Sequence, residues 1–167
     1  GLPQAIAERA RAEHAAGRPY KLNVWTGAST APECDGVMAE ADAIGQRLPF
    51  NTDPTTRKQI NTGQIDFIDM HLSHVAQHAW FGFFGKMDVA VIEVLGVTAD
   101  GLLIPSTAVG NNKTWLEIAD KVILEVNTRL PIQMEGMHDI YYGTAIPPRR
   151  MPISMTHADN RIGEPYL

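Results

Sequence analysis

The sequence predicts an α/β fold with a mostly parallel sheet and helices on both of its faces. Apolar, strand-like segments alternate along the chain with segments of helical periodicity, a pattern typical of parallel sheets. The most strand-like segments, residues 87–97 and 121–126, are almost continuously apolar, as expected of strands buried on both faces. A chain of 167 residues is long enough for one domain with its own core.

The first half of the chain contains three helical patterns. Pro3 stands where the first turn of a helix tolerates proline, and Gly17 stands where a helix commonly ends. A strand is expected at 20–26, followed by a helix at 32–44 with Val37, Met38, Ala41 and Ile44 on its inner face. The remaining elements are an extended piece at 48–50, a helix that Asp53 and Pro54 open and Gly63 closes, and a short strand at 65–68.

The second half alternates in the same way. We expect a helix at 71–84, the strand at 87–97, a turn at Asp100-Gly101 with a returning hairpin arm at 102–104, a helix from Asn112 to Asp120, and the strand at 121–126. Beyond Leu130 the sequence becomes irregular and rich in proline, which predicts a long connection with short strands.

Composition limits the classes of function. The formal net charge of -5 argues against a nucleic-acid partner, which usually needs a basic face. No apolar run reaches transmembrane length, so we expect no membrane partner. The single cysteine, Cys34, cannot form an internal disulfide, and we expect a cytoplasmic, reducing location.

The turn at 26–30, Thr-Gly-Ala-Ser-Thr, follows a strand and precedes a helical pattern. Such turns present backbone N–H groups and hydroxyls to an anion, although many of them hold no ligand. A second polar segment, 49–57, offers Thr52 as a ligand, whereas Asp53 is expected mainly to cap the following helix. A third segment, 104–112, contains Gly110 and Asn111 and is either a loop that closes over a substrate or an ordinary loop.

Two further groups have an ordinary explanation beside a functional one. His71, His74 and His78 fall on one helical face and could bind a metal, but they lack a recognisable ligand spacing, and an exposed or hydrogen-bonded face is favoured. Glu93 and Glu125 lie in the two most apolar strands, where a carboxylate needs a partner or a raised pKa. A position near a strand end or a partner arginine explains both glutamates without catalysis.

Eight segments, in order along the chain, resemble the acetyl-CoA hydrolase/transferase family. They are Thr-Gly-Ala-Ser-Thr at 26–30, Pro-Phe-Asn-Thr-Asp at 49–53, Asp-Met-His-Leu-Ser at 69–73, Ile-Pro-Ser-Thr-Ala-Val-Gly-Asn at 104–111, Ala-Asp-Lys-Val-Ile at 119–123, Glu-Gly-Met-His-Asp-Ile-Tyr at 135–141, Pro-Pro-Arg-Arg-x-Pro-Ile at 147–153 and Asn-Arg-Ile-Gly at 160–163. The family's best-known members are succinyl-CoA:acetate CoA-transferases, with relatives acting on propionyl-CoA and succinate.

The resemblance implies the first of two similar α/β domains, of the CoA-transferase, NagB-RpiA-like type. Residues 1–167 would form most of this N-terminal domain, truncated at both ends, and the C-terminal catalytic domain would lie outside the chain. The family's nucleophilic glutamate belongs to that second domain, so neither Glu93 nor Glu125 matches it and no catalytic residue is expected here. The 167 residues alone are therefore expected to be inactive.

The resemblance also implies the substrates and the residues that hold them. Coenzyme A is expected as a substrate, bound largely outside this chain, and no metal is expected. The small carboxylate, acetate or succinate, would be oriented by Ser29 and Thr52, with backbone N–H groups of Gly27, Ala28, Ser29 and Thr30. Gly110 and Asn111 are the candidate substrate loop. The full-length protein is expected to form a homodimer. Two alternatives stay open: an acetyl-CoA hydrolase of the same family, and a non-catalytic metal-binding module built on the three histidines.

Overall fold

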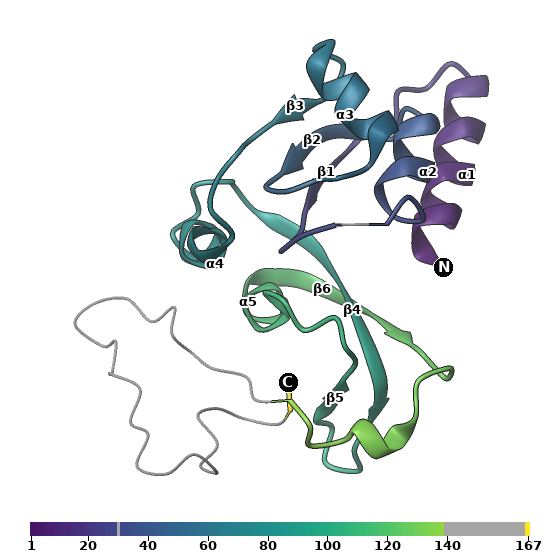
Figure 1. The fold of residues 1–167 in the computed structure, drawn as a ribbon. Helices are drawn as coiled ribbons and strands as arrows, with labels where there is room; N and C mark the ends of the chain where they lie inside the picture. The colour runs from purple at the N-terminus through teal and green to yellow at the C-terminus, as the bar shows by residue number, and fades with distance from the viewer. Residues whose placement is uncertain (30, 139–165) are drawn as a thin grey trace. The chain divides into compact units, whose positions relative to one another are not determined.

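The computed structural model describes residues 1–29, 31–138 and 166–167 and divides the chain into two compact units (Figure 1). The first unit is Gly1–Val75 and the second is Ala76–Leu167. Thr30 and the motifs at 147–153 and 160–163 lie outside the described residues, as do residues 139–141 of the motif at 135–141. Each unit is described by itself.

The first unit alternates helices and strands, as the sequence predicts. Its elements are α1 (Leu2–Ala15), β1 (Leu22–Trp25), α2 (Asp35–Glu40), β2 (Ile44–Leu48), α3 (Pro54–Asn61) and β3 (Asp66–Phe67). The three strands form one sheet in the order β1-β2-β3, and both pairings are parallel. The carboxyl ends of β1 and β2 therefore meet at the same edge of this sheet.

The core of the first unit forms around small side chains that let its first two helices approach. Ala7 and Ala10 of α1 are almost completely buried, and α1 contacts α2, whose Met38 and Ala39 are buried as well. Ile44 of β2 joins the same apolar cluster. Burial of this cluster removes apolar surface from water and stabilises the fold by about 25 cal/mol for each Å².

The predicted helix at 32–44 is wrong at both ends. The structure begins α2 only at Asp35, and Ile44 is the first residue of β2. The chain leaves the helix at Asp42, whose φ of 52° is left-handed, while the amide of Ala43 donates to the carbonyl of Met38 at 2.9 Å. This is the hydrogen-bonding pattern that closes helices. Ile44 fits the apolar spacing of the predicted helix only by coincidence, because it belongs to β2 and its side chain is buried there as part of the sheet.

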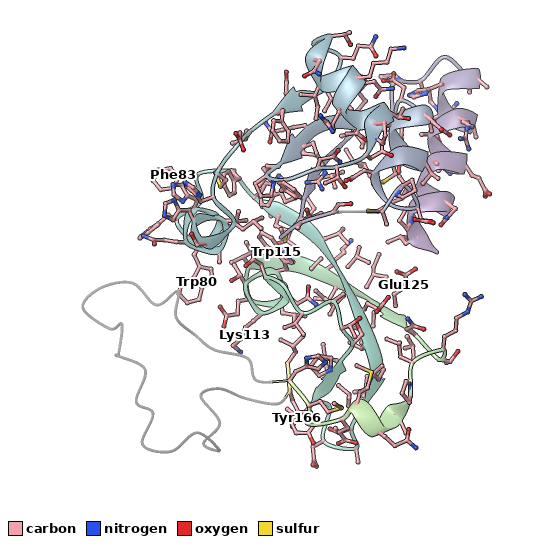
Figure 2. All side chains as sticks on the ribbon, in the orientation of Figure 1. Trp80, Phe83, Lys113, Trp115, Glu125 and Tyr166 are labelled. Carbon is pink, nitrogen blue, oxygen red and sulfur yellow. The ribbon has the colours of Figure 1, made fainter. Side chains whose placement is uncertain are left out.

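The second unit is built on a mixed sheet. It contains β4 (Met87–Val97), β5 (Leu103–Pro105), α5 (Asn112–Ile118), β6 (Ala119–Val126) and the short 3-10 helix η1 (Ile132–Met134), while α4 (Leu72–Trp80) spans the division between the units. The strand order is β5-β4-β6, with β4 antiparallel to β5 and parallel to β6. Trp115 of α5, labelled with Lys113 in Figure 2, is buried, and α5 contacts both β4 and β6.

The bounds predicted for β4 are confirmed, but its predicted burial on both faces is wrong. Ile92 and Val94 are fully buried, whereas Val89 and Val91, which alternate with them, are 44% and 41% exposed. Most of the apolar side chains of β6 are also exposed, so the prediction of a buried strand at 121–126 is wrong too. The physical reason is that burial depends on a covering layer, and among the described residues one face of β4 lacks such a layer.

The described end of the chain returns to the second sheet. Leu103 and Leu167 exchange two backbone hydrogen bonds, of 2.9 and 3.1 Å. The hydroxyl of Tyr166, which is labelled in Figure 2, donates to Glu135 at 2.8 Å. The α/β class with parallel strands and helices is thus confirmed, with the described strands divided between two three-stranded sheets. In the part of the chain that the structure describes, none of the helices combines the length and apolarity that a membrane crossing requires.

Candidate functional site

Two polar segments lie side by side where β1 and β2 end. The amide of Thr26 donates to the carbonyl of Leu48 at 3.1 Å, and the amide of Ser29 donates to that of Phe50 at 3.4 Å. Ser29 and Asn51 form an isolated parallel bridge. The structure therefore brings Ser29 next to the segment that carries Thr52, at the sheet edge where α/β proteins usually bind ligands.

The two hydroxyl residues differ in exposure. Ser29 is only 8% exposed, whereas Thr52 is exposed to solvent. The amide of Ser29 is used in the bridge, but those of Gly27 and Ala28 make no hydrogen bond to any described residue. The segment thus offers hydroxyl groups together with backbone N–H groups, which are the donors that an anion accepts.

A completely buried ion pair contacts the backbone that leads into the second of these segments. Arg47 of β2 and Asp35 of α2 are both 0% exposed. The guanidinium donates two hydrogen bonds to the carboxylate, at 2.9 Å from Nε to Oδ1 and 3.0 Å from Nη2 to Oδ2. Arg47 also donates to the main-chain carbonyls of Leu48 and Phe50, the latter at 3.3 Å. The arginine therefore fixes the backbone that leads from β2 to Thr52.

Asn51 connects the bridge to this ion pair. Its side-chain amide donates to Oδ2 of Asp35, while its Oδ1 is buried and accepts no hydrogen bond from the described residues. The hydroxyl of Thr26 is also buried and makes no hydrogen bond to the described residues. Such atoms are uncommon in folded proteins and mark places where water or a ligand completes the hydrogen bonding.

Sequence reasoning missed Asp35, Arg47 and Asn51. A usable signal was present, because Arg47 lies between the buried residues Ile44 and Leu48 of a strand, where a charge requires a partner. The sequence did not identify that partner, which lies 12 residues away on another element. Asp53, by contrast, acts as predicted: its Oδ1 accepts from the amide of Thr56 at 2.8 Å and caps α3.

The predicted substrate loop belongs to the second unit. Gly110 is exposed with a φ of 42°, and Asn111 stands at the N-cap of α5 without a side-chain capping bond. The loop is held from within, since the buried Ser106 accepts from the amide of Ala108 at 3.1 Å and Asn112 donates to the carbonyl of Ala108 at 2.7 Å. Its role toward a substrate stays a prediction.

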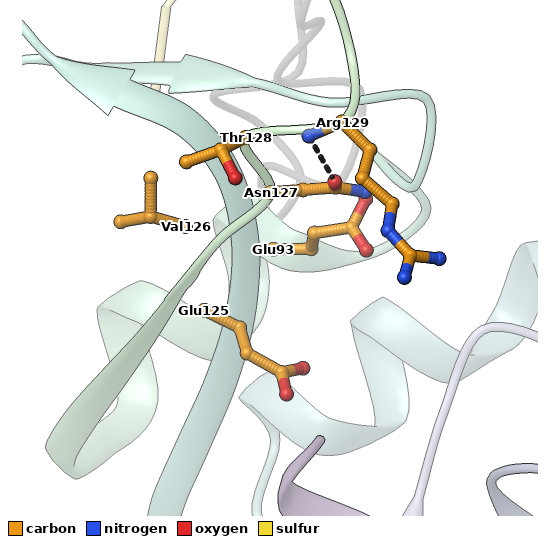
Figure 3. Close-up of a pocket in the computed structure, with 6 residues that line it drawn as sticks. All are labelled: Glu93, Glu125, Val126, Asn127, Thr128 and Arg129. Atoms are coloured by element: carbon orange, nitrogen blue, oxygen red, sulfur yellow. Dashed lines mark hydrogen bonds between the residues drawn. The ribbon is translucent and has the colours of Figure 1, made fainter.

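Glu93 of β4 and Glu125 of β6 line a pocket of about 350 Å³ beside the carboxyl end of β6 (Figure 3). The two glutamates are paired in the register of the parallel strands, and both are half-buried. The amide of Arg129 donates to Oδ1 of Asn127 at 3.0 Å and shapes the turn beyond β6. The pocket sets the two carboxylates of Glu93 and Glu125 against the single guanidinium of Arg129, so it suits a small carboxylate less well than the Ser29 segment.

The three histidines make contacts with aromatic rings. The rings of His71 and His74 meet edge to face, with centroids 5.7 Å apart, and the ring of His78 stacks on Phe84 at 6.2 Å. Among the residues that the structure describes, no group of three or more His, Cys, Asp or Glu side chains is arranged to hold a metal ion.

Comparison with known proteins identifies the family. The model of the acetyl-CoA hydrolase/transferase N-terminal domain matches residues 1–150. The chain is 43% identical over 166 residues to the succinyl-CoA:acetate CoA-transferase of Clostridium kluyveri, covering 99% of this chain and 30% of the relative. It is also 43% identical to the propanoyl-CoA:succinate CoA transferase of Escherichia coli K12, covering 99% of this chain and 34% of the relative.

More distant relatives carry a different name. The acetyl-CoA hydrolase of Schizosaccharomyces pombe is 34% identical over 172 residues, covering 99% of this chain and 32% of the relative. The chain thus spans about a third of the length of these curated relatives. The match to the family model covers most of the chain and includes the Ser29 and Thr52 segments. The chain therefore belongs to the acetyl-CoA hydrolase/transferase family, whose N-terminal domain it matches.

Proposed function

We propose that this chain holds the small carboxylate in a CoA-transferase that exchanges CoA between an acyl-CoA and an acid such as acetate or succinate. The observation that supports this role is the backbone bridge between Ser29 and Asn51, which joins the two hydroxyl-bearing segments at one sheet edge. The names of the two relatives at 43% identity agree with this substrate class.

The proposed contacts use neutral donors. The hydroxyls of Ser29 and Thr52 and the amides of Gly27 and Ala28 orient the carboxylate oxygens, with the amide of Thr30 as a further predicted donor. Hydrogen bonds from neutral groups are weaker than those from a lysine or arginine. The carboxylate is therefore positioned while it keeps enough electron density to act as a nucleophile.

The rest of the reaction is assigned to the part of the protein outside this chain. A glutamate there attacks the acyl-CoA carbonyl, which gives an acyl-glutamyl anhydride and releases CoA thiolate. The thiolate attacks the glutamyl carbonyl, which gives a glutamyl-CoA thioester and frees the donor acid. The acceptor carboxylate held by Ser29 and Thr52 attacks this thioester and forms a second anhydride, and the released thiolate attacks the acceptor's acyl carbon. The glutamate is restored as the new acyl-CoA leaves.

The carboxylate site is tested by the double variant Ser29→Ala, Thr52→Ala in the full-length protein. Loss of two hydrogen bonds from neutral hydroxyls to a charged carboxylate, at about 1.5–3 kcal/mol each, predicts a KM for the carboxylate raised roughly 100-fold or more, with the KM for acyl-CoA little changed. Thr62→Ala with Ser73→Ala is the matched control, because both residues are exposed hydroxyls of the same unit. Unaltered kinetics for the carboxylate in the Ser29, Thr52 variant would contradict the assignment.

A hydrolase is the second candidate, because several relatives at 32–35% identity are named acetyl-CoA hydrolases. The transferase is favoured because the two relatives at 43% identity are both transferases. Supplying acetate or succinate to the full-length protein with a different acyl-CoA separates the two. A transferase forms the new acyl-CoA, whereas a hydrolase only consumes thioester.

A homodimer and a cytoplasmic location complete the proposal. The dimer rests on the family resemblance, and the location rests on the single cysteine of the chain, Cys34. Light scattering on the full-length protein tests the dimer, and fractionation of the source cells tests the location.

A further inference from the structure

The buried Asp35–Arg47 pair is hydrogen-bonded to the backbone at the end of β2 and just beyond it, as well as within the pair. All three nitrogens of the guanidinium donate: Nε and Nη2 to Asp35, Nη1 to the carbonyl of Leu48, and Nη2 also to the carbonyl of Phe50. Both side chains are fully buried. Burying two charges costs several kcal/mol of desolvation each, and an apolar pair of similar volume is often as stable. Stability alone therefore does not account for this pair.

The pair connects three separate pieces of the first unit. Asp35 begins α2, just after the turn that contains Ser29. Arg47 belongs to β2, and its carbonyl acceptors, Leu48 and Phe50, lead toward Thr52. A planar, doubly bonded fork fixes both distance and orientation between the elements that it joins.

The network reaches Ser29 through the two residues that face it. The carbonyl of Phe50 accepts both Nη2 of Arg47, at 3.3 Å, and the amide of Ser29, at 3.4 Å. Asn51, the bridge partner of Ser29, donates its side-chain amide to Asp35. Movement of the ion pair would therefore move the backbone opposite Ser29 and the start of the segment that carries Thr52.

We propose that Asp35, Arg47 and Asn51 are positioning residues that fix the spacing between Ser29 and Thr52 and thereby set the affinity for the acceptor carboxylate. The inference rests on the proposed function of Ser29 and Thr52 and adds the residues that hold them in place. Binding groups act only when their supporting contacts hold them within a fraction of an ångström of the productive position. The hydroxyls contact the carboxylate, and the three network residues act through them.

Asn51→Ala in the full-length protein is the sharpest test. Asn51 is half-buried and stands at the end of the network, so its truncation removes one contact to Asp35 and leaves the ion pair in place. Asn61→Ala, an identical change at an exposed position of α3, is the matched control. Arg47→Lys is the second variant, because lysine keeps the charge and loses the fork.

Two measurements are made on each variant. The KM for the carboxylate is expected to rise about fivefold or more in Asn51→Ala and Arg47→Lys, with the KM for acyl-CoA changed less than about twofold. Hydrogen exchange of the amides of Thr26 and Ser29, which donate to the carbonyls of Leu48 and Phe50, is expected to quicken at least about fivefold, while exchange in α1 stays unchanged. The second readout does not depend on activity. Asn61→Ala is expected to change neither quantity.

The outcomes separate this inference from the function on which it rests. Unchanged exchange at the amides of Thr26 and Ser29 and an unchanged carboxylate KM in a folded Asn51→Ala or Arg47→Lys protein overturn the positioning role. If Ser29→Ala, Thr52→Ala raises that KM while the network variants do not, the inference alone fails. If exchange at the amides of Thr26 and Ser29 quickens but no variant alters the carboxylate KM, the proposed function fails and the network has no role in affinity. If Asn51→Ala does not fold, Arg47→Lys decides by the same two measurements.

Discussion

Replacing the buried ion pair by apolar residues should cost less stability than removing either partner alone. Asp35→Leu leaves the guanidinium of Arg47 buried without its counter-ion, and Arg47→Met leaves the carboxylate of Asp35 in the same condition. Removing one partner of a buried pair costs about 3–5 kcal/mol, because the remaining charge is uncompensated. Each single variant should therefore be strongly destabilised.

The contacts around the pair give the expected cost of the double variant. The carbonyls of Leu48 and Phe50 would lose Arg47, but each keeps a second donor, the amides of Thr26 and Ser29. The side-chain amide of Asn51 would lose its acceptor. An unsatisfied buried donor costs about 1–3 kcal/mol, and Asn51 is half-buried, so Asp35→Leu with Arg47→Met should lose no more than about that amount.

Thermal unfolding of the full-length variants measures the order of these costs. The double variant is expected to melt above both single variants, since the two changes are strongly coupled. Lys21→Met, which removes an exposed pair of 2.8 Å to Asp42, serves as the control and should cost less than about 1 kcal/mol. A double variant that melts at or below the single variants would refute the argument that the uncompensated charge is the main cost.

Two further predictions concern the same unit. A Cβ atom on Gly36 would lie 2.8 Å from Oδ2 of Asp53, so Gly36→Ala should disturb the cap of α3 and lower stability by about 1–3 kcal/mol, measured by thermal unfolding. The pKa of Glu13 lies below its ordinary value of 4.5 because Arg18 donates a hydrogen bond to it, with burial acting in the opposite direction and the charges of Arg18 and Arg9 adding to the lowering. A carboxyl group whose pKa is lowered on folding stabilises the fold at pH values above its unfolded pKa, and this stabilisation is lost as the pH falls through its folded pKa. The difference in Tm between the wild type and Glu13→Gln should therefore shrink below pH 4.5. A difference that stays constant on acidification would show that the ion pairs of Glu13 contribute nothing to it.

Local signals predicted the elements well. The helix opened by Asp53 and Pro54 was foreseen because a cap and an N1 proline act within one turn. The bounds of β4 followed from eleven residues of strand-like composition. The exposure of Val89 and Val91 could not be read in the same way, because it depends on which elements cover the sheet.

The sequence predicted the two hydroxyl residues of the candidate site but not the residues that support them. Ser29 and Thr52 came from the family resemblance, and their adjacency is a matter of strand register between distant segments. The pairing of Asp35 with Arg47 joins a helix to a strand, and no spacing rule relates the two residues. The chain leaves α2 at Asp42, which has a left-handed backbone conformation. Aspartate adopts this conformation more readily than most residues, but an aspartate in a sequence does not by itself predict it.

The exposed strand β6 has a consequence for any preparation of residues 1–167 alone. In the described part of the chain no strand pairs with its outer edge, and Val122, Ile123 and Leu124 on it are all more than a third exposed. A bare edge with apolar side chains is a template on which a second molecule adds its own strand. Samples of this segment will therefore tend to self-associate as they are concentrated, and activity and affinity are best measured on the longer polypeptide.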